Sequence, residues 1–215
     1  MRGVIDLAAT SVFLDFDGTV SLVDTGRYVL ERLGADGWRD VEVAYERGLI
    51  GSREVLSQEW PLVVGGLDVA LEVAREVVVD PGFELLVAAL RQRDAEVTVV
   101  SDGFGFYASE VCAAAGVAVL TNEVDGSGEL VFPWTDRCCP CSTCGVCKQA
   151  PIKDAHRRGR TTVLVGDGVS DRKAALLADI IYAKADLADW CDDAGVAYRA
   201  YAGLSDVHRT LVGLR

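Results

Sequence analysis

Acidic residues in three short glycine-containing motifs are the side chains best suited to chemistry in this sequence. The motifs are Asp15-Phe-Asp17-Gly18-Thr19, Ser101-Asp102-Gly103 and Gly166-Asp167-Gly168-Val169-Ser170-Asp171. Asp15 and Asp17 are two residues apart, so on an extended segment both carboxylates point to the same side. One carboxylate can then attack phosphorus while the other handles the leaving-group proton, and both can share a Mg²⁺ ion.

The other two motifs each have a chemical interpretation and a plain structural one. Asp167 is a candidate to complete a metal site, and Asp171 to orient a ligand or a lysine, but acidic residues also cap helices. Ser101, with backbone N–H groups that open a helix, is a candidate to hold phosphate oxygens. Ser-Asp-Gly is also an ordinary turn.

A fixed cation is the remaining requirement of a metal-assisted phosphoryl site. The sequence has lysines at Lys148, Lys153, Lys173 and Lys184. Lys148 precedes the strand that carries the third motif and is the best candidate, with Lys153 second. His-Glu pairs at zinc-ligand spacing, a serine nucleophile elbow and a Walker-type loop do not occur, which disfavours those hydrolase classes.

The elements that must position these motifs are short apolar strands alternating with helices. Strands are expected at residues 10–15, 96–100, 117–120, 161–165 and 179–183, and helices at 83–93, 104–115, 152–158, 171–177 and 185–194. This alternation predicts an α/β fold with a Rossmann-like parallel sheet covered on both faces. Ligands of such folds bind outside the carboxyl ends of the strands, where all three motifs lie.

Residues 21–80 break the alternation and predict four consecutive helices at 24–33, 38–47, 52–60 and 67–77. A helical block inserted after the first strand would cover the strand ends as a cap domain. Residues 1–20 and 81–215 would then form the catalytic core. Alternation around Asp125-Gly-Ser-Gly128 predicts a β-hairpin within 121–134 of that core.

Composition excludes several other classes. A formal net charge of −12 disfavours broad nucleic-acid binding. No run approaches the ~18 apolar residues that span a membrane, and the first apolar stretch is interrupted by acidic residues, which makes a poor signal peptide. A cytoplasmic enzyme is therefore expected, and a homodimer is left open.

The order DFDGT at 15–19, VVSDG at 99–103, Lys148 and GDGVSD at 166–171 resembles the haloacid dehalogenase superfamily. The helical insertion after the first motif resembles the C1 cap of its phosphoserine phosphatase-like branch. The resemblance covers most of the chain and implies a Mg²⁺-dependent phosphatase.

The resemblance also implies a role for each motif residue. Asp15 would be the nucleophile that forms an aspartyl-phosphate, and Asp17 the general acid and then the base. Mg²⁺ would be held by Asp15, the Asp17 backbone carbonyl and Asp167, with support from Asp171. Ser101 and the amides of Asp102 and Gly103 would bind phosphate. Lys148 would neutralise charge on the phosphate and the nucleophile.

A closer likeness is to the methionine-salvage phosphatases, which act on 2-hydroxy-3-keto-5-methylthiopentenyl-1-phosphate. It rests on Cys144-Gly-Val-Cys147-Lys148, Gly51-Ser-Arg53-Glu54, Ala183-Lys184 and Trp190-Cys191. Those relatives look more like Ser-Gly-Gly where this chain has Ser-Asp-Gly, a departure that affects the substrate assignment but not the chemistry. Candidates to face a substrate from the cap are Asp24, Arg27, Arg53, Glu54 and Trp60; each is alternatively an exposed helix residue.

Five of the seven cysteines crowd into one segment, at Cys138, Cys139, Cys141, Cys144 and Cys147. The spacing suits a local Zn²⁺ site, but a second, distant cysteine pair is missing. Unligated thiols and a regulatory disulfide are the alternatives. Because the cluster adjoins Lys148, its oxidation could displace that lysine and make activity redox-sensitive.

Functions of different classes remain open. The leading prediction is hydrolysis of a small phosphorylated metabolite, and the methionine-salvage ester competes with phosphoserine, phosphoethanolamine, phosphocholine and nucleotide or sugar phosphates. A methylthio substrate predicts an apolar cap pocket, whereas phosphoserine predicts a paired carboxylate and cation. A phosphotransferase would share the aspartyl-phosphate. A non-catalytic metal-binding module built on the cysteines predicts a missing motif residue, and none is missing.

Overall fold

The computed structural model describes residues 5–135 and 142–213. Within these ranges the main sheet consists of β1 (Thr10–Leu14), β2 (Glu96–Val100), β3 (Ala118–Leu120), β6 (Thr161–Gly166), β7 (Ile180–Ala183) and β8 (Arg199–Ala200). The strand order is β3-β2-β1-β6-β7-β8, and every pairing is parallel. The predicted parallel sheet is therefore confirmed.

The register of the three central strands brings the sequence motifs to one edge. Leu14 of β1 pairs with Val99 of β2 and with Val165 of β6. The motif residues that follow these strands therefore end up side by side. The backbone N–H of Asp15 extends the ladder by donating to the carbonyl of Val165 at 2.9 Å.

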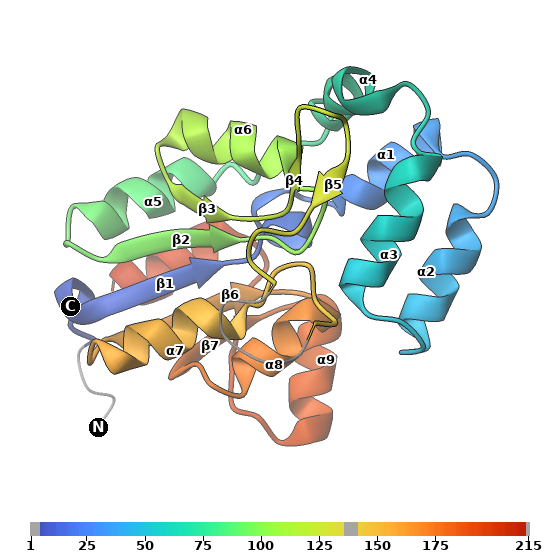
Figure 1. The fold of residues 1–215 in the computed structure, drawn as a ribbon. Helices are drawn as coiled ribbons and strands as arrows, with labels where there is room; N and C mark the ends of the chain where they lie inside the picture. Colours follow the sequence, from blue (N-terminus) through green and yellow to red (C-terminus); the bar gives the residue numbers. More distant parts are fainter. Residues whose placement is uncertain (1–4, 136–141, 214–215) are drawn as a thin grey trace.

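Helices cover both faces of the sheet, so β1 is buried along its whole length. Val12 and Leu14 belong to the core cluster that includes α5 (Phe83–Arg91) and α6 (Phe106–Ala115). The intervening Phe13 belongs to the cluster on the other face, with α7 (Gln149–Arg157), α8 (Arg172–Ala175) and α9 (Ala185–Ala194). Figure 1 shows these two helical layers on either side of the strands.

Residues 21–80 form a separate group of helices: α1 (Thr25–Leu33), α2 (Trp38–Glu46), α3 (Ser52–Glu59) and α4 (Gly66–Ala74). Asp24 caps α1 by accepting from the Arg27 N–H at 2.8 Å. The N-cap residues of α2, α3 and α4 are glycines. Figure 1 places this helical block beside the carboxyl ends of the central strands. A cap function for the block stays a prediction.

A short hairpin of β4 (Glu123–Val124) and β5 (Leu130–Val131) lies within the region expected to contain one. Its turn is held by Asp125 Oδ1, which accepts from the N–H of Ser127 at 2.8 Å. Trp60 of the helical block donates from Nε1 to the Gly128 carbonyl at 2.9 Å. The hairpin is thereby attached to the end of α3.

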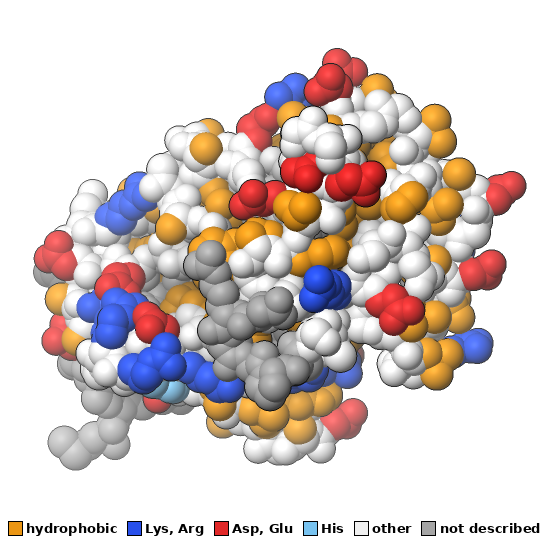
Figure 2. Space-filling view, in the orientation of Figure 1, with side chains coloured by type: hydrophobic (Ala, Val, Ile, Leu, Met, Phe, Trp, Pro, Cys, Tyr) orange, Lys and Arg blue, Asp and Glu red, His pale blue; other side chains and the backbone are white. Residues whose placement is uncertain are grey.

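Basic side chains gather over α7 on the face that Figure 2 shows. Several are paired, since Arg157 contacts Asp154 at 3.1 Å and Arg158 contacts Glu96 at 2.7 Å. These ion pairs lower the net positive charge of that surface. Across residues 5–135 and 142–213, every helix falls short of the length and apolar character needed to cross a membrane.

Candidate active site

A buried lysine joins two of the three sequence motifs. Lys148 Nζ lies 2.7 Å from Asp15 Oδ1, 2.8 Å from Asp171 Oδ1 and 2.7 Å from Ser170 Oγ. All but Ser170 are buried. Burial alone would lower the pKa of Lys148, but the carboxylates of Asp15 and Asp171 raise it above its ordinary value. The lysine is therefore a fixed cation at the end of β1.

Three carboxylates meet at this lysine. Oxygens of Asp15, Asp167 and Asp171 all lie within 4.8 Å of one another, the group of potential metal ligands found in the described part of the chain. Burial, and then the neighbouring charge of Asp171, raise the pKa of Asp15. Three carboxylates against one ammonium group leave two negative charges, so the donor set suits a divalent cation such as Mg²⁺.

Gly18 allows this approach of the first motif to the third. Its φ is +77°, in the left-handed region, and a Cβ there would overlap Asp167 Oδ2. Thr19 Oγ1 donates to Asp167 Oδ1 at 2.6 Å. A side chain at position 18 would thus displace one of the clustered carboxylates.

The Asp17 side chain turns away from the carboxylate cluster and toward the helical block. Its Oδ1 accepts from the N–H of Thr25 at 2.9 Å, and its Oδ2 from Ser101 Oγ at 3.2 Å. Burial, and then the charge of Asp24, raise the pKa of Asp17 to about 6, against the opposing hydrogen bonds from Thr25 and Ser101. A carboxyl in this environment is able to carry a proton near neutral pH.

The second motif supplies a hydroxyl and a backbone amide beside Asp17. Ser101 Oγ accepts from the Gly103 N–H at 3.2 Å, and Asn122 Nδ2 donates to the Gly103 carbonyl at 2.7 Å. Ser101 is buried at the end of β2. The loop therefore holds polar groups at the same edge of the sheet as Asp15.

Asp102 connects this loop to two other segments. Its Oδ2 accepts from Ser52 Oγ at 2.5 Å, at the start of α3, and its Oδ1 accepts from the Val146 N–H at 2.7 Å. Val146 is two residues before Lys148. The side chain of Asp102 thus links the loop at 101–103 to the helical block and to the segment that carries Lys148. The family resemblance does not indicate this role.

We expect Asp102→Ala to lower the free energy of unfolding by about 2 kcal/mol, since it leaves the Ser52 hydroxyl and the Val146 N–H without their half-buried acceptor. Ser52→Ala removes only the hydroxyl that donates to Asp102 and should lower the free energy of unfolding by less. Chemical denaturation of both variants measures the difference. Equal losses would contradict a link from Asp102 to the lysine segment.

A cavity of about 400 Å³ lies between the strand ends and the helical block. Its floor includes Asp15, Asp17 and Asp167, and its wall includes residues of α1, α2 and α3. The charged wall residues are mainly acidic: Asp24, Arg27, Glu42, Glu46 and Glu59. Apolar contact comes from Val55 and Leu56 on α3. This cavity size suits a small metabolite.

Glu59 is the least expected of the wall residues. It is 4% exposed, and its Oε1 has no hydrogen-bond partner among the described residues. Burial first, and then the charges of Glu42 and Asp24, raise its pKa to about 8. It also stands at the carboxyl end of α3, where the helix dipole disfavours negative charge. The ionised form of the Glu59 side chain is therefore disfavoured in the folded protein.

We expect Glu59→Gln to stabilise the protein increasingly as the pH rises. Because the folded-state pKa lies above the ordinary value of 4.5, the unfolded state loses its proton first and wild-type stability falls as the pH rises toward 8. The variant should gain on the order of 2–3 kcal/mol over the wild type near pH 8 and little near pH 4. Denaturation curves at both pH values test this. A gain independent of pH would contradict the assignment to Glu59 ionisation.

Residues 12–176 match the family model of the haloacid dehalogenase-like hydrolases. The chain belongs to this family. The match spans the interval from β1 to α8, which contains all three acidic motifs and Lys148. The chain is thus a hydrolase by family, as the order of its motifs predicted.

The chain also matches known proteins over nearly their whole length. The chain is 26% identical over 208 residues to a 2-hydroxy-3-keto-5-methylthiopentenyl-1-phosphate phosphatase of Brevibacillus brevis, covering 93% of this chain and 94% of that protein. It is 24% identical over 216 residues to Pdp3-interacting factor 1 of Schizosaccharomyces pombe, covering 93% of both.

Solved structures confirm the fold. A phosphoserine phosphatase from T. onnurineus matches with a TM-score of 0.70 and 17% identity, covering 100% of both chains. A substrate-bound phosphoserine phosphatase complex matches with a TM-score of 0.69 and 18% identity, covering 94% of this chain and 97% of the other. At these identities the likeness concerns the fold.

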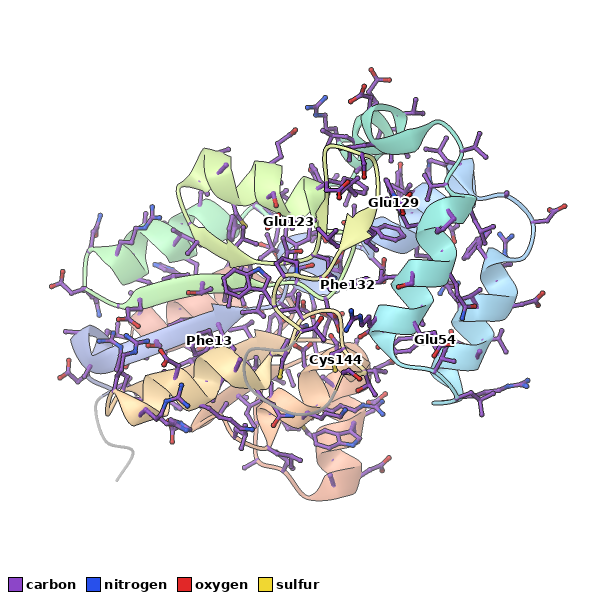
Figure 3. The ribbon with its side chains drawn as sticks, in the orientation of Figure 1. Phe13, Glu54, Glu123, Glu129, Phe132 and Cys144 are labelled. Carbon is purple, nitrogen blue, oxygen red and sulfur yellow. The ribbon has the colours of Figure 1, made fainter. Side chains whose placement is uncertain are left out.

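The predicted substrate-facing residues of this family member separate into two groups. Asp24 and Arg27 line the cavity, and Arg27 pairs with Glu31 at 3.4 Å and Glu42 at 4.0 Å. Arg53, Glu54 and Trp60 are not among its lining residues. The Arg53 guanidinium lies 5.1 Å from the Phe132 ring, and Glu54 is exposed on the face that Figure 3 shows.

The cysteine segment is described in part. Cys138, Cys139 and Cys141 lie outside the described residues, whereas Cys144 is half-buried and Cys147 buried. Segment 143–146 contacts the start of α3: Arg53 N–H donates to the Thr143 carbonyl at 3.2 Å. Cys144 is labelled near this junction in Figure 3. The potential metal ligands found together in the described residues are aspartates, which gives the zinc hypothesis no support.

Sequence reasoning missed several residues around the site. Tyr201 Oη lies 3.0 Å from Thr19 Oγ1 and 3.3 Å from the Gly166 carbonyl, so it supports the contact of Thr19 with Asp167. Glu42, Tyr45 and Glu59 line the cavity. None of these belongs to a motif, and helical periodicity alone does not tell which face meets the core.

Proposed function

We propose that this hydrolase is a Mg²⁺-dependent phosphatase that acts on a small phosphomonoester through an aspartyl-phosphate intermediate. The observation that carries the proposal is the contact of Lys148 Nζ with both Asp15 and Asp171 at the strand ends, beside the carboxylate of Asp167. This arrangement combines a carboxylate nucleophile, a fixed cation and a place for a divalent ion.

The first step transfers the phosphoryl group to the protein. An Asp15 carboxylate oxygen attacks phosphorus, and the bond between phosphorus and the ester oxygen breaks. Asp17 gives its proton to the departing alcohol, which its elevated pKa favours. The N–H of Phe16, 2.7 Å from Asp15 Oδ1, and Lys148 hold the nucleophile in a fixed orientation.

The second step releases phosphate. Asp17 takes a proton from water, whose oxygen attacks phosphorus, and the bond to Asp15 breaks to regenerate the carboxylate. Ser101 Oγ and the Gly103 N–H lie beside Asp17 and would bind the phosphoryl oxygens through both steps. Lys148 would neutralise part of their charge.

Asp15, Asp167 and the Asp17 backbone carbonyl would hold Mg²⁺, with Asp171 behind them. When bound, the ion would supply positive charge against the oxygens of the transferring phosphoryl group. The residual two negative charges of the carboxylate–lysine cluster support this ligand set.

The helical block would act as a cap that selects the substrate, since it forms the cavity wall opposite the motifs. The name of the Brevibacillus relative makes 2-hydroxy-3-keto-5-methylthiopentenyl-1-phosphate one candidate. Val55 and Leu56 offer a methylthio group limited apolar contact. The buried Glu59 favours a second candidate class, that of phosphoserine and phosphoethanolamine.

Phosphate release from a panel of phosphomonoesters tests the proposal. With Mg²⁺ we expect turnover of at least one ester, loss of turnover when EDTA removes the metal, and recovery when Mg²⁺ is added back. Release that is equal with and without EDTA would contradict the metal requirement. An added alcohol that accepts the phosphoryl group faster than water does would show a phosphotransferase instead.

A further inference from the structure

The wall of the cavity has an unbalanced charge. Of its charged residues on α1, α2 and α3 and at the cap of α1, Asp24, Glu42, Glu46 and Glu59 are acidic and Arg27 is basic. Arg27 already pairs with Glu31 and Glu42. A substrate that brings a second negative group to this wall would meet net repulsion.

Glu59 shows where the imbalance is least compensated. Its carboxyl is buried, and Oε1 has no partner in the described residues. The neighbouring charges that act on it, Glu42 and Asp24, have the same sign. A buried acidic group without a hydrogen-bond donor destabilises a fold. Because Glu59 lines the cavity, a ligand that enters the cavity can supply the missing donor.

The side of the same cavity formed by the strand ends has the features of a phosphate site. Asp15, Asp17, Gly103 and Ser170 line it there, next to the buried Lys148. A ligand with a phosphate at one end and a cation at the other would match both the strand-end side and the acidic wall. The volume of about 400 Å³ limits it to a small molecule.

We propose that Glu59, with Glu42 and Asp24, forms an ammonium subsite, and that the substrate is a small phosphomonoester whose far end carries a primary amine. This inference rests on the proposed phosphatase function and specifies its substrate class. A primary ammonium donates hydrogen bonds to carboxylates, which fits Glu59 Oε1. A neutral methylthio end would leave that atom unpaired.

The substrate pair that isolates the ammonium is O-phosphoethanolamine and n-propyl phosphate, which have nearly the same shape. We expect wild-type kcat/KM to be at least about tenfold higher for O-phosphoethanolamine, the factor that one charged hydrogen bond provides. O-Phosphoserine, with its added carboxylate, should rank below O-phosphoethanolamine. Equal values for the first pair would overturn the inference.

Glu59→Gln tests the assignment to this residue. The ratio of the two kcat/KM values should fall toward one in this variant. Glu54→Gln, the same substitution at an exposed position of the same helix, should leave the ratio unchanged. An unchanged ratio in Glu59→Gln would overturn the subsite. The wild-type ratio still tests the preference for an amine if Glu59→Gln does not fold.

The same assays distinguish failure of the subsite from failure of the phosphatase function. If wild-type protein hydrolyses n-propyl phosphate with Mg²⁺ but shows no preference for the amine, the ammonium subsite fails and the phosphatase function stands. If no ester is hydrolysed, the phosphatase function fails. Thermal unfolding with ethanolamine and inorganic phosphate gives a readout apart from turnover: together they should raise the Tm of wild type more than that of Glu59→Gln.

Discussion

Asp15→Asn should reduce phosphate release at least about a thousandfold, because an amide cannot form the aspartyl-phosphate. The side chain keeps its shape, and Asn can still accept from the Phe16 N–H that contacts Asp15 Oδ1. The loss should therefore appear in kcat while the protein remains folded. Steady-state assays with saturating Mg²⁺, together with a thermal melt, measure both quantities.

Acid quenching of wild-type turnover should trap one phosphoryl group on the peptide that contains Asp15, and none in the variant. Asp193→Asn is the matched control, since Asp193 is exposed on α9 and lies outside the cavity lining. A variant at position 15 that still forms the phosphorylated peptide would place the nucleophile elsewhere.

Lys148→Met should lose both activity and stability. Removal of the ammonium leaves Asp15 and Asp171 buried without the cation that lies 2.7 and 2.8 Å from them. Breaking a buried ion pair in this way costs about 3 kcal/mol, and loss of a charge that stabilises the phosphoryl group lowers kcat about 100- to 1000-fold. Chemical denaturation and kinetic assays report the two effects separately.

Mg²⁺ sharpens this prediction. The variant keeps the three carboxylates, so added Mg²⁺ should raise its Tm at least as much as that of wild type while turnover stays low. Lys153→Met on α7 is the control, since Lys153 is the second lysine that the sequence suggested. Full activity of Lys148→Met would remove the lysine from the proposed mechanism.

The sheet and the helices were predictable because they follow from local patterns of apolar and polar residues. Apolar, β-branched runs such as Val97-Thr98-Val99 form strands wherever both faces are covered, and each predicted strand is present. Two later elements were missed: β8 (Arg199–Ala200) is two residues long and α10 (Leu204–Val207) four. Segments this short have no measurable periodicity.

The site was predictable where a motif ended a strand, because parallel strands bring their carboxyl ends to one edge. Asp15, Lys148, Asp167 and Asp171 meet there, although their catalytic roles stay predictions. Which helix faces line the cavity was not predictable. Glu59 and Glu54 are five residues apart on α3, yet one is buried at the cavity and the other exposed. That choice depends on tertiary packing.

The contact of Tyr201 with Thr19 has a consequence for how this fold can be divided. The family match ends at residue 176, yet the hydroxyl that supports Thr19, and through it Asp167, comes from a residue 25 positions later. A segment that ended at residue 176 would therefore contain all the motifs but lack the hydroxyl that holds Thr19 in place. Substitutions at Tyr201 would shift Thr19 and, through it, the carboxylate of Asp167. Substitutions at positions 19 and 201 should therefore occur together among homologues.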